Sequence, residues 1–176
     1  MRKLLAILVF LILFTIGCSS QTLHDAINGK YESPEILYQN DDVGVVIFLT
    51  KNNDGDYIIC RSSYERNNFN RYVFDSNDDF SFPIDISNKS EFIYMDIIGE
   101  HTETPLHMVW GGIFHYPSAK HVAYKVQNNE GTVIQNEVDI NKKHIFVDIL
   151  AEGIEESHSI TFDVMDRDGN ILFSYN

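Results

Sequence analysis

The sequence predicts a mainly β protein, an antiparallel β-sandwich with one short helix near its N-terminus. Short apolar runs recur about every ten residues in the second half of the chain, as in sandwich proteins. Turn sequences rich in Asn, Asp and Gly separate these runs. Residues 23–28 have apolar side chains at helical spacing. The strand spacing predicts an immunoglobulin-like arrangement in the C-terminal half.

The chain opens with a segment unlike the rest of it. Arg2 and Lys3 give a basic start, the residues from there to Ile16 are almost all apolar, and Gly17 and Cys18 close the segment. This order is typical of a secretion signal. The apolar run is shorter than the about 20 residues that a membrane-spanning helix needs. We therefore favour a cleaved signal over an uncleaved membrane anchor.

The sequence Thr15-Ile16-Gly17-Cys18 resembles the lipobox of bacterial lipoproteins, in which a diacylglycerol is attached to the cysteine sulfur. Thr15 departs from the family pattern, which usually has Leu at this position. The resemblance implies signal cleavage between Gly17 and Cys18, lipidation of Cys18 with fatty-acyl chains such as palmitate, and an extracytoplasmic protein anchored to the cell membrane. The alternative is a generic signal in which Cys18 is incidental.

The chain is strongly acidic. From Cys18 onward it has 26 Asp and Glu but 11 Lys and Arg, because Arg2 and Lys3 precede Cys18, and its formal charge is −15. Nucleic acids and anionic lipid headgroups repel such a chain. We therefore expect no nucleic-acid binding, and we expect the domain to stand off the membrane that holds its lipid.

We divide the chain into four segments. Residues 1–17 are the lipoprotein signal peptide, 18–21 a lipidated tether, 22–100 a short helix with an N-terminal β region, and 101–176 a C-terminal β-sandwich region. The last two segments form either one domain or two. About 159 residues suffice for a sizeable core.

The helix is expected over residues 23–28, with Thr22 as N-cap and Gly29 at its end. Residues 62–90 are polar and aromatic, and we expect a loop over 75–79 within them. Pro83 limits its surroundings to an edge strand or a bend. We expect strands over residues 35–38, 43–50, 57–61, 71–74, 92–98, 106–114, 121–126, 133–140, 144–150, 160–164 and 171–173.

The order of these patterns is similar to that of small lipoproteins and secreted proteins of Gram-positive bacteria. The shared features are Ala26-Ile27 in the short helix, an apolar strand over 44–48, a Gly-containing strand over 110–114, a Val-rich strand over 122–126 and an Asp-x-Asp-Gly-Asn turn at 166–170. No established activity comes with this resemblance, so it implies no catalytic residues.

No sequence motif predicts catalysis, a cofactor or a metal site. The turn at 166–170 lacks the Gly and Glu positions of a calcium-binding EF-hand, and we interpret the Asp residues at 75, 78, 79 and 85 as a solvated loop. With Cys18 lipidated, Cys60 has no disulfide partner, and its apolar surroundings predict a small buried side chain. Gly111-Gly112 indicates a bulge or a close backbone approach.

Trp110 and Tyr116 are the residues that we would expect in an interaction patch. Trp110 is the single tryptophan of the chain, and Tyr116 follows it closely. If Trp110 faces outward, the two form a flat aromatic recognition surface; the alternative is that Trp110 fills the core of the sandwich.

The sequence thus predicts a membrane-anchored, non-catalytic binding or interaction module at the cell envelope, with an envelope protein or polymer as its partner. Two alternatives remain: an envelope hydrolase with a site assembled from distant loops, and a purely structural envelope component.

Overall fold

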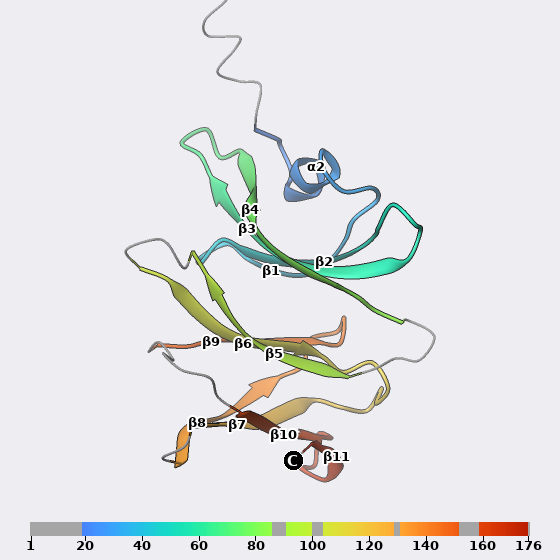
Figure 1. Cartoon of the computed structure of the whole chain (residues 1–176), viewed down its shortest axis with the longest axis vertical. Helices are drawn as coiled ribbons and strands as arrows, with labels where there is room; N and C mark the ends of the chain where they lie inside the picture. The colour runs from blue at the N-terminus through green and yellow to red at the C-terminus, as the bar shows by residue number, and fades with distance from the viewer. Residues whose placement is uncertain (1–18, 86–90, 100–103, 129–130, 152–158, 176) are drawn as a thin grey trace, which may run out of the picture. The chain divides into compact units, whose positions relative to one another are not determined.

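A computed structural model describes residues 19–85, 91–99, 104–128, 131–151 and 159–175 (Figure 1). The expected signal peptide and Cys18 lie outside these residues. The described chain is mainly β, with antiparallel sheets and one short helix. No helix among these residues is long and apolar enough to cross a membrane.

The chain divides into two compact units, one ending at Pro83 and the other beginning at Ile84. The boundary between the two units lies earlier in the chain than the boundary expected near residue 100. The reason is that β5 (Phe92–Ile98) pairs along its whole length with β6 (Leu106–Gly112), and therefore belongs to the C-terminal unit.

The N-terminal unit is a four-stranded antiparallel sheet with a helix on one face. The sheet order is β1-β2-β3-β4, and Leu23 and Ile27 of the helix are buried against Val46, Phe48 and Cys60 of the sheet. The Thr22 side chain accepts a hydrogen bond from the Asp25 amide at 3.1 Å, which confirms the N-cap. The elements are α2 (Leu23–Asn28), β1 (Glu35–Asn40), β2 (Val45–Lys51), β3 (Tyr57–Arg66) and β4 (Tyr72–Pro83).

The prediction of a loop over residues 75–79 is wrong, because β4 continues through these residues. Ser63 lies opposite Asp75, whereas Arg61 lies opposite Phe80, so a single residue of β3 faces four residues of β4. This bulge breaks the alternation of side chains that would have identified the strand.

The C-terminal unit is a sandwich of two antiparallel sheets. One sheet has the order β5-β6-β9 and the other β11-β10-β7-β8. The expected antiparallel β-sandwich is confirmed. If its seven strands are lettered A, B, C, C′, E, F and G in chain order, so that β8 is C′ and no strand D is counted, the two sheets are A-B-E and G-F-C-C′, an immunoglobulin-like order. The remaining strands are β7 (His121–Asn128), β8 (Gly131–Asp139), β9 (Ile145–Ile149), β10 (Ser159–Met165) and β11 (Ile171–Tyr175).

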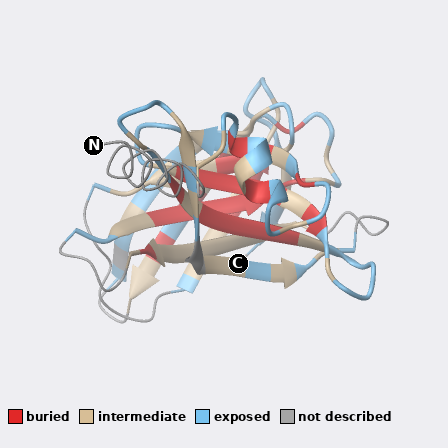
Figure 2. Ribbon diagram, turned by 90° about the horizontal axis from the view of Figure 1, so that it is seen from above, coloured by how far each residue is buried: buried red, intermediate tan, exposed pale blue. Residues whose placement is uncertain are grey.

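Both sheets contribute to the core of this sandwich. Its buried residues are Val109, Ile113, Ala119, Val122, Tyr124, Val126, Phe146, Phe162 and Val164. Asp148 of β9 connects the sheets at one side, since it accepts hydrogen bonds from the Tyr124 hydroxyl (2.5 Å) and the Asn136 amide (2.8 Å). Figure 2 shows buried residues along the middle of strands and exposed residues in the connecting turns.

The close backbone approach expected at Gly111-Gly112 is confirmed. A Cβ on Gly111 would lie 2.2 Å from the Phe92 carbonyl oxygen and 2.6 Å from the Phe146 ring.

We expect Gly111→Ala to destabilise the unit by about 3 kcal/mol in urea unfolding, since the backbone would have to move. Gly29→Ala, whose Cβ would meet nothing closer than 3.4 Å, is the control. Equal stability of the two variants would contradict this packing.

Candidate functional site

The C-terminal sandwich does not fully cover the inner face of its larger sheet. Four strands face three, and β11 is an edge strand of the larger sheet. Tyr175 and Phe173 lie opposite the core residues Phe162 and Val164 of β10, so they point to the same inner face. Tyr175 is nevertheless 56% exposed. The inner face of β11 is therefore accessible to solvent.

A groove of about 460 Å³ lies at this position. Most of its lining is aromatic or aliphatic, and Tyr175 stacks on Phe162 with ring centroids 5.6 Å apart and an interplanar angle of 22°. The lining residues come from β5 and the residue before it, β10 and β11: Glu91, Phe92, Ile93, Tyr94, Ile160, Phe162, Phe173 and Tyr175. Such a groove suits apolar side chains of a ligand.

Glu91 is the charged residue of the groove lining. Its Oε1 accepts a hydrogen bond from the His115 amide at 3.0 Å, which fixes the position of the carboxylate. The groove therefore combines flat aromatic faces with one negative charge, and both features attract cationic groups.

The strand edge beside the groove is uncharged. Of the six edge strands in the described sheets, β11 alone contains no charged residue; the opposite edge of its own sheet, β8, contains Glu137 and Asp139. Among the described residues, β10 is the one strand paired with β11. Edge strands without charge or proline are templates for an additional strand.

Trp110 and Tyr116, the two residues expected in an interaction patch, differ in their exposure to solvent. Trp110 is fully buried, with its ring centroid 5.5 Å from that of Phe92 and 5.9 Å from that of Tyr94. It therefore packs against two groove residues but does not form a surface. Tyr116 is partly exposed and stacks on Phe173 at 5.8 Å. The sequence did not predict that Phe162, Phe173 and Tyr175 line a groove. Strand spacing along the chain does not show that β5 and β11 lie near each other in the fold.

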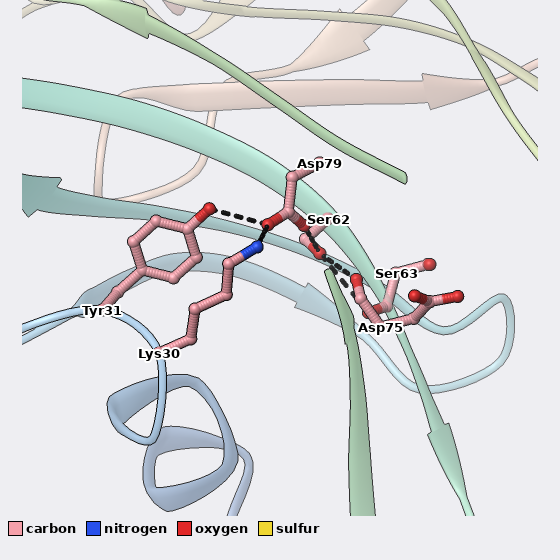
Figure 3. Close-up of polar contacts among 6 residues, drawn as sticks. All are labelled: Lys30, Tyr31, Ser62, Ser63, Asp75 and Asp79. Atoms are coloured by element: carbon pink, nitrogen blue, oxygen red, sulfur yellow. Dashed lines mark hydrogen bonds and ion pairs between the residues drawn. The ribbon is translucent and has the colours of Figure 1, made fainter. Parts of the chain in front are cut away.

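A partly buried polar cluster lies in the N-terminal unit, around Asp79 of β4 (Figure 3). Its Oδ2 accepts hydrogen bonds from the Tyr31 hydroxyl at 2.7 Å and from Lys30 Nζ at 2.8 Å. The Ser62 hydroxyl contacts Oδ1 and lies 2.8 Å from the Asp75 carbonyl oxygen. Asp79 thus connects the segment after α2 to the bulged strand.

The chemistry of this cluster is structural. Ser62 is fully buried and Asp79 already binds a cation, so the hydroxyl has neither access to a substrate nor an available base. Burial, with a smaller contribution from Asp79, raises the pKa of the nearby Cys60 thiol to about 12. The expectation that Cys60 is a buried side chain is confirmed.

Three partly or fully buried tyrosines predict loss of stability at alkaline pH. Burial, and then a hydrogen bond to a carboxylate, raises the pKa of Tyr31, Tyr64 and Tyr124. A raised folded-state pKa contributes stability below the unfolded value of about 10, and this stability is lost as pH rises above it. We expect the urea midpoint to fall between pH 9 and 11.5, and less steeply in Tyr124→Phe. A urea midpoint that stays unchanged between pH 9 and 11.5 would contradict the raised pKa values of these tyrosines.

The acidic turn at 166–170 is structural as well. The Asp166 carboxylate accepts hydrogen bonds from the amides of Asp168 and Asn170 at 2.9 Å each, as in a hairpin turn. Within the described ranges, no three His, Cys, Asp or Glu side chains are grouped to hold a metal ion.

Comparisons with protein-family models, with curated proteins and with solved structures find no match to this chain.

Proposed function

We propose that this chain is a lipid-anchored, extracytoplasmic binding module without catalytic activity, which takes an extended segment of an envelope protein at the edge of β11. The observation that carries the proposal is the uncharged edge of β11 beside an aromatic groove. A peptide added as a fifth strand would pair its backbone with β11 and place alternate side chains in the groove.

The anchor is the part of this proposal that comes from the sequence. Arg2 and Lys3, the short apolar run and Gly17-Cys18 support signal cleavage and lipidation at Cys18. Lipidation at this point places the module at the outer face of the cell membrane, where it meets segments of other envelope proteins.

Charge favours a basic peptide as the ligand. Residues 84–176 have 15 Asp and Glu but 6 Lys and Arg, a formal charge of −9 (6 − 15). Glu91 adds a carboxylate in the groove itself. Lys and Arg side chains gain from the carboxylate and from aromatic faces, whereas an anionic envelope polymer is repelled.

The test uses a synthetic peptide of about ten alternating Val and Lys residues and the soluble chain from Ser19. We expect binding in titration calorimetry, with slower amide exchange in β11. Ile171→Lys, on β11, should weaken binding about tenfold or more, because an edge charge blocks strand addition and repels the peptide. Ile171 is 59% exposed, so this variant should fold.

The matched control is Val133→Lys, on the opposite edge of the same sheet. Val133 is also an exposed apolar residue, at 49%. Binding that is equally weakened by both substitutions, or protection of amides in β8 and not in β11, would contradict the proposal. A peptide of alternating Val and Glu should bind at least about tenfold more weakly, given the sign of the charge.

A further inference from the structure

The described chain begins beside a hairpin of the N-terminal unit. Ser20 forms two backbone hydrogen bonds with Tyr72, the first residue of β4, each of 2.9 Å. Cys18 precedes Ser20 by two residues, so their Cα atoms are at most about 7 Å apart. A lipid on Cys18 would therefore enter the bilayer close to the β3–β4 hairpin.

The tip of this hairpin holds a large apolar side chain in solvent. Phe69 is 85% exposed, the highest value among the exposed large apolar residues of the described chain. The turn that carries it is well formed: the Asn67 side chain accepts hydrogen bonds from the amides of Phe69 (3.0 Å) and Arg71 (3.1 Å), and Asn70 has a positive φ of 57°. The turn thus holds Phe69 away from the sheet.

The tip of the hairpin lacks the negative charge that prevails in the rest of the chain. Residues 66–74 contain Arg66 and Arg71 and no Asp or Glu, whereas the chain from Cys18 has a formal charge of −15. Arg66 lies over the Tyr72 ring at 4.6 Å and forms an ion pair with Asp41 at 2.8 Å, so its position is fixed beside the hairpin. Asp41 offsets the charge of Arg66, so Arg71 is the residue at the hairpin tip that attracts anionic headgroups, which repel the rest of the chain.

We infer that the β3–β4 hairpin is a second membrane contact, in which Phe69 enters the bilayer interface and Arg71 lies near the phospholipid headgroups. The inference rests on the proposed lipid at Cys18. One phenylalanine binds a bilayer weakly, but the anchor supplies a high effective concentration at the surface. The domain then does not stand off the membrane; it has a fixed orientation, hairpin toward the lipid.

Site-specific tryptophan fluorescence tests this orientation. The chain from Cys18 is made without the signal and coupled through the Cys18 thiol to a maleimide phospholipid in vesicles of phosphatidylglycerol and phosphatidylcholine. Cys60 is buried and its thiol pKa is raised, so coupling occurs at Cys18. The Phe69→Trp variant is compared with the parent chain, whose Trp110 gives the background, in vesicles with and without brominated lipid.

The control variant is Tyr57→Trp, at the opposite end of the same strand. Tyr57 is 41% exposed and begins β3, while the hairpin follows Arg66 at its end. Nine residues of strand separate these ends by about 30 Å. Tyr57→Trp therefore reports contact of the other end of the sheet with lipid.

We expect brominated lipid to reduce the added emission of Phe69→Trp about twofold or more and to leave that of Tyr57→Trp almost unchanged, given the shallow depth of interfacial residues. Equal quenching of both variants, or of neither, overturns the inference. Chemical coupling replaces lipidation by the cell, so failure here would leave the proposed anchor intact. Conversely, if cells do not lipidate the chain, the proposed function is contradicted, whereas this measurement on the chemically coupled chain is unaffected.

Discussion

Asp79→Ala should lower the free energy of unfolding of the N-terminal unit by about 3 kcal/mol. The substitution removes the acceptor of Tyr31, Lys30 and Ser62 together. Ser62 is fully buried and would be left with the Asp75 carbonyl as its remaining partner of normal length. This expected loss of stability is smaller than the largest loss on breaking a buried ion pair, because the Lys30 side chain is 43% exposed and would be hydrated.

Amide exchange measured by mass spectrometry on fragments of β2 and β3 follows this unit, since Trp110 fluorescence reports on the other one. Asp79→Asn should have an intermediate effect, because it retains an acceptor oxygen without the charge. Asp54→Ala, in the exposed turn between β2 and β3, is the control and should change stability by less than about 0.5 kcal/mol. Equal behaviour of Asp79→Ala and Asp54→Ala would show that the cluster does not stabilise the unit.

Cys18→Ala should reduce the membrane-bound, processed protein by about tenfold or more. The reason is that two acyl chains supply nearly all of the membrane affinity, at about 0.8 kcal/mol per buried methylene, and the hairpin contact alone is weak. The protein should be found in the medium or as an unprocessed precursor, as measured by cell fractionation and the mass of the N-terminal peptide.

Cys60→Ala is the matched control for this experiment, since Cys60 is buried in the N-terminal unit and is not an attachment point. It should remain in the membrane fraction with a normal N-terminus. Full membrane retention of a cleaved Cys18→Ala protein would contradict the lipid anchor.

Local signals predicted much of the fold. The Thr22 cap and the apolar spacing of Leu23 and Ile27 gave the bounds of α2, and an almost unbroken apolar run gave those of β5. These patterns depend on residues near each other in the chain. The spacing of the strands in the second half also predicted the sandwich.

Features made by residues distant in sequence were not predicted. Local sequence patterns predict a loop at the bulge in β4, because its extra residues break the alternation. The partners of Asp79 are Lys30 and Tyr31, which lie far from it in the sequence. The groove requires β5 to lie near β10 and β11, which no local pattern encodes. A large side chain such as Trp110 fits a core or a surface equally well by sequence.

Photo-crosslinking on living cells tests the central claim most directly. Benzoylphenylalanine in place of Tyr175, beside the groove, should form an adduct with an envelope protein, and peptide mapping should place the attachment in an extended segment rich in apolar and basic residues. Ile171→Lys should remove the adduct, and the same label in place of Val133 should give none. Adducts of equal yield from both positions, or from neither, would contradict a binding site at β11.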